Sequence, residues 1–198
     1  MASCNFLTRN LIPSCEALQA VGGVNLLIRV GQLDDIDTIT FGADGEILTF
    51  SLLTGKSLKA FSGKKEKHQG TYELTAGETV NLFNQSVILA LYFRSAAERS
   101  AVDELVNSEN MFAFVQTNDG VIEAYGISNK PLLDFASFGL EATAGTGNGT
   151  GVLINDDKVY RVTLSGNVPN LPMNYKPADT LANNLIGLDA ITYPNLAP

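Results

Sequence analysis

The sequence contains little of what metal sites and disulfide frameworks require. Its 198 residues include two cysteines and one histidine, and there is no tryptophan. Cys4 and Cys15 are too few for a disulfide framework, and with a single histidine they make no recognisable zinc site. We therefore read both cysteines as free thiols and predict neither a metal nor a cofactor.

Charge is also scarce, and what is present is mainly negative. Charged residues make up 17% of the chain and hydrophobic residues 45%, and the formal net charge is -8. Soluble chains average about 25% charged residues, so less surface than usual is committed to solvent, and burial between subunits would account for this. Proteins that grip nucleic acid need clustered Lys and Arg, so the acidic balance argues against tight nucleic-acid binding but not against DNA sliding past the surface.

No long hydrophobic run is present. The longest, residues 87–93, is far shorter than the roughly 20 residues that cross a bilayer. Residues 11–15 loosely resemble the end of a lipoprotein signal, but the polar residues before them interrupt any apolar region. We expect a protein made in the cytoplasm, without secretion or membrane insertion.

The clearest positive signal is a hairpin within residues 110–127. Two alternating runs rich in aromatic and β-branched residues meet at an Asn-Asp-Gly sequence, whose Asp-Gly pair suits a two-residue type I′ turn. Such a loop would place Phe114 opposite Tyr125. One face would then carry Phe112, Phe114, Tyr125 and Ile127, and the other Met111, Ala113, Val115 and Ile122. Because both faces are apolar, the ribbon is expected inside a sandwich or against another subunit.

The remaining pattern predicts more strands and one helix in the main body. Strands are expected at residues 24–30, 37–53 (a hairpin turning at 43–45), 71–75, 79–93, 132–143 and 158–164. The alternation loses its phase near Asn84 and Gln85, which predicts a bulge there. Ser95 and Glu98 have capping-box spacing and predict a helix over about residues 95–107. Its buried stripe should be Ala97, Ala101, Val102, Leu105 and Val106.

The predicted fold class is mainly β, an antiparallel β-sandwich or barrel with one flanking α-helix and an extended C-terminal arm. We divide the chain into an N-terminal lead-in arm (1–23), a β-sandwich domain (24–166) and the C-terminal arm (167–198). The arm is punctuated by proline but is too apolar for a disordered tail. It has a possible short helix over residues 179–186, ended by Gly187. Such an arm lies on its own body or on a neighbour, and we favour the neighbour.

Three stretches look like functional motifs but are better explained without a functional site. Residues 34–37 hold three aspartates without EF-hand spacing, so a solvated turn is favoured over calcium binding. Residues 145–151 alternate glycine with Thr and Asn, but they lack the ending of a phosphate loop and the helix of a dinucleotide loop, so we read them as a turn. His68 lies in a lysine-rich segment, and no nucleophile-elbow sequence is present, so we predict no catalytic residue.

Five of the 13 basic residues fall within residues 56–67. A solvated loop is the favoured interpretation, because charge runs usually face water. Docking on the acidic face of a neighbouring copy is the sharper alternative. Phosphate binding is a third option, but it lacks the interleaved aromatic residues of single-strand binders. If this segment and the C-terminal arm dock on a neighbouring copy, both supply candidates for contacts between subunits. In the lysine-rich segment they are Lys64, Lys65 and Lys67, and in the arm they are Leu171, Tyr175, Leu185 and Tyr193.

The order of several short motifs resembles a known family. These motifs are Cys15 followed by Gly22-Gly23-Val24, Tyr72-Glu73-Leu74 after a lysine-bearing loop, Tyr125-Gly126 at the end of a strand pair, and Gly139-Leu140 followed by Thr143 and the glycines of residues 145–151. Over about residues 15–166 the chain resembles the major structural proteins of tailed phages that infect Bacteroidota, of the tail-tube type. The arm after Gly166 departs from the shorter members of that family.

The resemblance implies a structural virion protein of the phage tail and not an enzyme. Its fold would be a β-sandwich flanked by one helix, with copies joining their inner sheets into hexameric rings that stack into a tube and conduct DNA during ejection. Its partners would be other copies, other tail or neck proteins, and DNA in transient, non-specific passage. We name Asp37, Asp44 and Glu46 as lumen-lining candidates, since an acidic lumen repels phosphates. A neck or connector ring and a tail terminator are alternatives, followed by a small-molecule-binding β-barrel or an enzyme.

Overall fold

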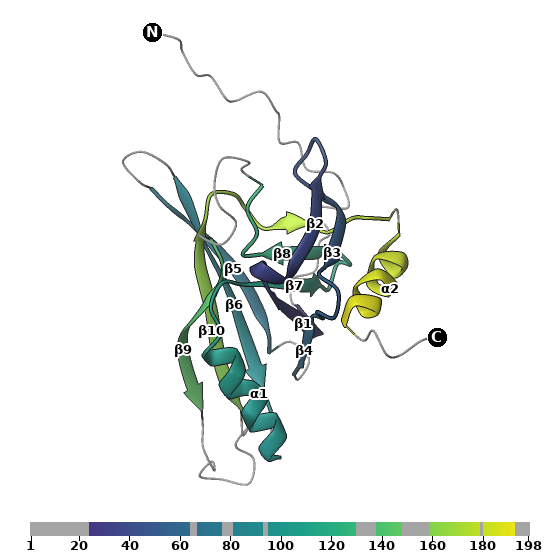
Figure 1. The fold of residues 1–198 in the computed structure, drawn as a ribbon. Coiled ribbons are helices and arrows are strands. Elements are labelled where there is room, and N and C mark those ends of the chain that lie inside the picture. The colour runs from purple at the N-terminus through teal and green to yellow at the C-terminus, as the bar shows by residue number, and fades with distance from the viewer. Residues whose placement is uncertain are drawn as a thin grey trace.

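The chain folds into three layers with a five-stranded sheet in the middle (Figure 1). The structure is a computed structural model, and it describes residues 24–63, 67–76, 81–92, 95–129, 138–147, 159–178 and 180–192. The predicted lead-in arm (1–23) lies outside these described residues.

The strands and helices follow the order expected for a mainly β chain. The first elements are β1 (Val24–Gln32), the 3-10 helix η2 (Leu33–Asp35), β2 (Ile36–Phe41), β3 (Ile47–Leu52), β4 (Lys59–Ser62), β5 (Gln69–Thr75) and β6 (Leu82–Leu91). The remaining elements are α1 (Ala96–Val106), β7 (Met111–Thr117), β8 (Ile122–Tyr125), β9 (Glu141–Gly147), β10 (Tyr160–Val168), β11 (Met173–Asn174) and α2 (Leu181–Thr192).

Antiparallel pairing joins these strands into two packed sheets and a separate hairpin. The central sheet has the order β11-β8-β7-β1-β4, and the four-stranded sheet has the order β5-β6-β10-β9. The two-stranded β2–β3 sheet and α2 lie on the other side of the central sheet (Figure 1). The predicted fold class, an antiparallel β-sandwich with a flanking helix, is confirmed.

Two hydrophobic cores hold the layers together. The first core lies between the two larger sheets and is centred on Ile28, Val87, Leu89, Met111, Ala113, Val115, Val162 and Leu164. The second lies under β2–β3 and α2 and is centred on Ile47, Leu58, Phe112, Phe114, Ile127, Tyr175 and Leu188. Phe114 makes edge-on ring contacts with Phe50 at 5.1 Å and with Tyr175 at 5.0 Å between ring centroids.

The β7–β8 hairpin is apolar on both faces, as predicted, but the predicted register is wrong by one residue. Phe114 lies opposite Ala124 instead of Tyr125. The loop has three residues, because the Thr117 N–H donates to the Val121 carbonyl (2.8 Å) and Gly120 adopts a positive φ of 88°. A one-residue slip moves side chains to the opposite face. Tyr125 therefore packs in the first core and Ile122 in the second.

The predicted bulge in β6 is absent. Residues 83–91 of β6 pair with β10 without a register shift. The alternation loses its phase because Gln85 points inward and is fully buried. Its Oε1 accepts the N–H of Gly126 (2.8 Å), and its Nε2 donates to the carbonyl of Asn170 (2.7 Å). A polar side chain therefore occupies a core position, where it satisfies two backbone groups.

Helix α1 begins with the predicted capping box. The Glu98 N–H donates to Ser95 Oγ (3.1 Å), and the Ser95 N–H donates to Glu98 Oε2 (2.8 Å). Of the predicted buried stripe, only Val102 and Leu105 are buried. The other three members, Ala97, Ala101 and Val106, are exposed.

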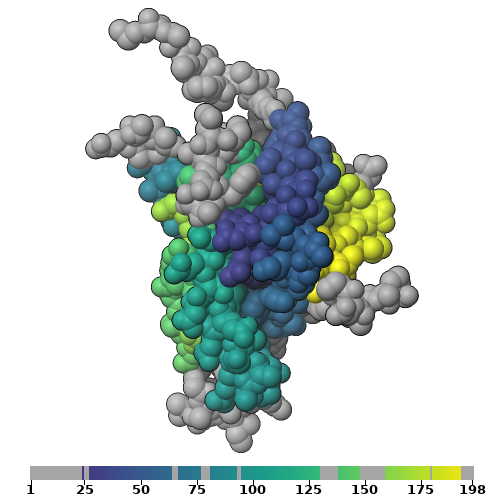
Figure 2. Space-filling model, in the orientation of Figure 1, coloured from purple at the N-terminus to yellow at the C-terminus, as the bar shows by residue number. Residues whose placement is uncertain are grey.

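The C-terminal arm packs on the body of its own chain, contrary to the preferred docking on a neighbour. Its helix α2 continues past Gly187, so the predicted end at that residue is wrong. Figure 2 shows α2, in yellow, against the blue surface of the β2–β3 region. Leu188 is buried in the second core, and Asp189 accepts a hydrogen bond from the buried Arg29 of β1. The arm is therefore partly helical and forms a cover for the central sheet.

The end of the sandwich domain differs from prediction in one further place. Strand β9 includes Gly145 and Gly147, which were expected in a turn. The rest of the glycine-alternating stretch and the first half of the predicted strand 132–143 lie outside the described residues. A Cβ at Gly145 would lie 2.4 Å from the Tyr160 hydroxyl, so the tyrosine ring packs where a side chain would otherwise be.

We predict that Gln85→Met lowers the free energy of unfolding by about 1–3 kcal/mol, because it leaves the Gly126 N–H and the Asn170 carbonyl without a partner. Urea denaturation of the full chain measures the loss. Ser86→Ala, at the adjacent half-buried position, is the control and should change stability by less than about 0.5 kcal/mol. Equal stabilities for the two variants would contradict the role given to Gln85.

Candidate assembly surface

The four-stranded sheet has one face packed in the first core and an outer face on which small polar side chains lie together with Leu82 and Ile88. Val87 and Leu164 point into the core, so their neighbours along β6 and β10 point away from it. The register places Thr71, Ser86, Ser165 and Glu141 in one row across the outer face, and Glu73, Asn84 and Asn167 in another. Asn84 Nδ2 donates to Asn167 Oδ1 at 3.2 Å, so polar groups pair along these rows.

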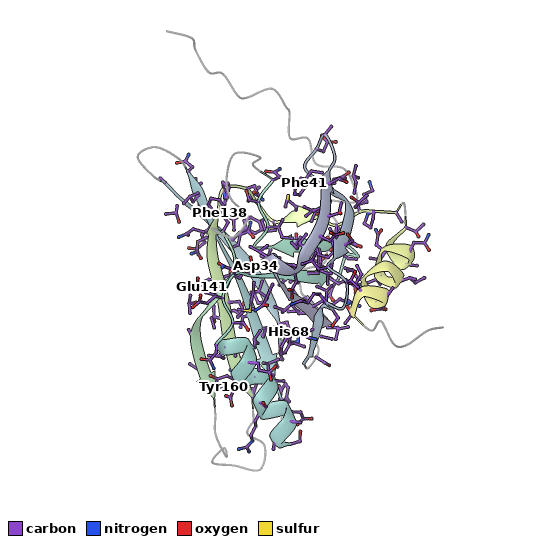
Figure 3. The ribbon with its side chains drawn as sticks, in the orientation of Figure 1. Asp34, Phe41, His68, Phe138, Glu141 and Tyr160 are labelled. Atoms are coloured by element: carbon purple, nitrogen blue, oxygen red, sulfur yellow. The ribbon has the colours of Figure 1, made fainter. Side chains whose placement is uncertain are left out.

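Few charges lie on this sheet. In the residues of its four strands, the charged side chains are Glu73, Glu141 and Arg161. Figure 3 places Glu141 on the side of the molecule away from α2. The face presents hydroxyl and amide groups with two carboxylates and one guanidinium, so it offers no cluster of cations to bind phosphate.

Both edges of the sheet are open in the described part of the chain. Strand β5 pairs only with β6, and β9 pairs only with β10. Each edge strand has seven residues, most of them exposed. Open edges present unpaired N–H and C=O groups that can pair with a strand of another chain. The two edges therefore have equal length, but the register sets β5 level with residues 82–88 of β6 and β9 level with residues 86–91.

The even number of strands decides how two such edges can meet. Because all pairs in the sheet are antiparallel, β5 and β9 run in opposite directions. A rotation about an axis roughly parallel to the strands keeps strand directions unchanged. The β9 edge of one copy would then meet the β5 edge of the next in antiparallel orientation, which gives a head-to-tail contact that closes into a ring when the rotation allows it.

A polar pair beside β5 consists of the buried Tyr125 and the half-buried Glu123. The Tyr125 hydroxyl donates to Glu123 Oε2 at 2.8 Å. It reaches β5 at Gly70, where a Cβ would lie 2.5 Å from that hydroxyl. Burial raises the pKa of Glu123 above its usual 4.5, while the hydrogen bond from Tyr125 opposes this rise. Burial, with the nearby Glu123 charge, also raises the pKa of Tyr125 above its usual 10.

The predicted contact residues differ in burial where the structure describes them. Lys64, Lys65 and Tyr193 lie outside those residues. Lys67 and Leu171 are exposed, Leu185 is half-buried, and Tyr175 is buried in the second core. Tyr175 is therefore a core residue of its own chain. For the other candidates, a role between copies stays a prediction.

The predicted lumen residues lie on the far side of the molecule from the four-stranded sheet. Asp37 is exposed on β2 and accepts a hydrogen bond from Ser51 at 3.3 Å. Asp44 is exposed in the turn, and Glu46 lies 3.7 Å from Lys176. Since β2–β3 covers the opposite face of the central sheet, a lumen lined by these residues and a lumen lined by the four-stranded sheet are alternatives.

A cleft of about 680 Å³ lies between β4 and α1. Its lining includes Phe61, Leu91, Tyr92, Ala101 and Val102, together with Glu98. Glu98 also accepts the Ser95 N–H of the helix cap. The cleft lies beside a helix at a sheet edge, and so it differs from the interior of a ligand-binding β-barrel.

The described residues hold no cluster of three or more His, Cys, Asp or Glu side chains suited to a metal ion. His68 is buried, and its Nδ1 accepts the Ala90 N–H at 3.0 Å. The side chain therefore links the start of β5 to β6. Neither described helix is long and apolar enough to cross a bilayer.

The open edges of β5 and β9 are the feature that sequence reasoning missed. Edge position depends on which strands become neighbours, and no local pattern reports it. The alternation in residues 71–75, where Tyr72 and Leu74 alternate with polar residues, predicts a strand but not its place in the sheet. That pattern is typical of a strand with one covered face.

The chain matches no protein-family model, no curated protein sequence and no solved structure.

We predict that Tyr125→Phe destabilises the protein more at pH 7 than at pH 4. The folded-state pKa of Glu123 is already raised, so its contribution to stability is full at low pH and is lost as the pH rises through that pKa. Removing the hydroxyl raises this pKa further, and the added loss at pH 7 should be on the order of 1 kcal/mol. Urea denaturation at the two pH values measures it.

Glu123→Gln is the matched background for this test, because it removes the titrating group. In that background, Tyr125→Phe should have the same effect at both pH values. A difference between pH 4 and pH 7 that persists without Glu123 would assign the effect to another group.

Proposed function

We propose that the protein is a structural subunit of a phage tail tube, which assembles into stacked hexameric rings whose lumen conducts DNA. The observation that carries this proposal is the four-stranded sheet, whose two antiparallel edge strands have no further partner among the described residues and whose outer face carries many small polar side chains. The resemblance of the motif order to tail-tube proteins of Bacteroidota phages supports it. In such a ring, β9 of each copy pairs with β5 of the next.

The outer face of the four-stranded sheet would line the lumen. Its Ser, Thr and Asn side chains can exchange water-mediated contacts with passing DNA without holding it. Arg161 is the one cation in the residues of its four strands, so phosphates meet no basic cluster. The net charge of -8 adds long-range repulsion. We prefer this lining to Asp37, Asp44 and Glu46, because a ring closed through the four-stranded sheet places β2–β3 away from the lumen.

A neck or connector ring and a tail terminator share the same ring geometry but do not polymerise. Negative-stain electron microscopy of the purified full chain separates these functions. We expect rings at moderate concentration and stacked tubes at higher concentration. Single rings that never stack would favour the connector or terminator role, and a monomer at every concentration would contradict all three.

A two-variant experiment tests the edges. Gln69→Glu with Thr75→Glu adds acidic residues beside Glu73 on β5, and Ala144→Glu with Thr146→Glu does the same beside Glu141 on β9; all four positions are exposed. Each variant keeps one native edge. Like charges on facing strands oppose pairing, so neither variant alone should assemble, and high salt should weaken the block.

An equimolar mixture should form a dimer and stop there, because one native β9 can meet one native β5 and the two remaining edges are both acidic. Sedimentation velocity measures the species present. Rings formed by either variant alone, or no dimer in the mixture, would contradict β5–β9 closure.

A further inference from the structure

The two edge strands of the four-stranded sheet lie at different levels along it. Strand β9 begins level with Ser86 of β6 and ends level with Leu91, because the two strands share their partners on β10. Strand β5 instead pairs with residues 82–88 of β6. Edges joined without any displacement along the strands would therefore pair only where they overlap, residues 141–144 with residues 69–71.

The side-chain faces limit how far one copy can be displaced against the next. Ala142 and Gly145 lie on the inner face of β9, since their partners on β10 point into the first core. Tyr72 lies on the inner face of β5, opposite the buried Gln85. Side chains alternate between faces, so only a displacement by an even number of residues keeps both inner faces on one side. Displacements of two or four residues toward the Leu91 end lengthen the overlap, and larger ones shorten it again.

Two carboxylates distinguish these registers. A displacement of two residues places Glu141 directly opposite Glu73 of the next copy, and like charges directly opposite each other destabilise an antiparallel pair. A displacement of four residues removes this clash and pairs every residue of β9 except Thr143, the extra residue at the register shift. The pairs are then Glu141 with Thr75, Ala142 with Leu74, Ala144 with Glu73, Gly145 with Tyr72, Thr146 with Thr71, and Gly147 with Gly70.

The same register places the exposed apolar residues of β5 opposite small residues of β9. In the single chain, Tyr72 is 51% exposed and Leu74 is 60% exposed. Their partners in the next copy would be Gly145 and Ala142. Gly145 would then lie between two tyrosines, because Tyr160 of its own chain already packs where a side chain would otherwise be. Large residues opposite small ones would cover the exposed part of β5 without a clash between two large partners.

We propose that β9 of one copy pairs with β5 of the next in this register, so that neighbouring copies are displaced by four residues along the strands. The inference rests on the proposed ring and specifies its geometry. Four residues span about 13 Å along a strand, and four strands span about 19 Å across a sheet. Copies in a ring lie at one height, so the strands must incline by about 35° to the ring axis to absorb this displacement, as in closed barrels with tilts of about 35–45°. A displacement of two residues would give only about 19°.

Disulfide cross-linking in the full chain distinguishes the registers. The two native cysteines are replaced by serine, Thr71→Cys is kept constant, and Thr146→Cys, Ala144→Cys or Glu141→Cys is added. These second positions lie opposite Thr71 of the next copy at displacements of four, two and zero residues, respectively. Strands β6 and β10 separate the two cysteines within one chain, so disulfides form between copies. Under ring-forming conditions with mild oxidation, we expect at least fivefold more cross-linking with Thr146→Cys than with either alternative, in a non-reducing gel ladder that ends at six chains.

A charge variant tests why this register is selected. Adding Glu141→Gln to the chain with Thr71→Cys and Ala144→Cys removes the repulsion from Glu73, so its cross-linking should rise at least twofold. Asp44→Asn, exposed in the turn on the far side of the molecule, is the matched control and should leave it unchanged. Equal cross-linking with both changes would contradict selection of the register by the two carboxylates.

Electron microscopy of the wild-type chain and the cysteine variants separates this inference from the function on which it rests. Rings with the strongest cross-linking through position 144 or 141 would overturn the four-residue displacement and leave the ring proposal standing. Rings without cross-linking in any variant would overturn pairing between β5 and β9. A wild-type chain that forms no ring would overturn both the register and the proposed function.

Discussion

Strand β7 has apolar side chains on both faces, and the three layers depend on that constraint. Five consecutive residues of β7, Met111 to Val115, are buried. A strand of this kind needs cover on both sides, and here it is the middle strand of the middle sheet. The four-stranded sheet covers one face, and β2–β3 with α2 covers the other. The β2–β3 hairpin and α2 cover the central sheet. They therefore do not pack on the outer face of the four-stranded sheet.

Local patterns predicted the elements well because alternation and capping act over a few residues. The hairpins, α1 and the fold class were accessible in this way. The β7–β8 register was not, because an Asn-Asp-Gly sequence permits both a two-residue loop and the three-residue loop closed by Gly120. Gln85 was misread since its partners, Gly126 and Asn170, are far away in the sequence. At Gly187, burial of Leu188 outweighs the roughly 1 kcal/mol cost of a glycine within a helix.

The candidate site was harder to predict than the fold. From the sequence, candidate contact residues were chosen by their charge and their apolar character. Those criteria selected the lysine-rich segment and the C-terminal arm. Tyr175 shows why apolar content misleads: a tyrosine in a proline-rich arm looks available to a neighbour, yet its ring packs against Phe114 in the second core. The open edges consist of backbone groups, whose availability follows from strand order alone. Strand order arises from long-range pairing, and a single sequence carries little information about it.

The composition of the two edge strands bears on the proposed ring closure. Proteins that keep open edges in solution commonly protect them with lysine, proline or bulges. Strands β5 and β9 contain no lysine and no proline, and their acidic residues are Glu73 and Glu141. Strand β9 does have an irregularity, because its register with β10 shifts between Thr163 and Leu164. An open row of subunits always keeps two free edges, however long it grows, whereas a closed ring keeps none. In the proposed ring, the rotation between neighbouring copies sets the copy number.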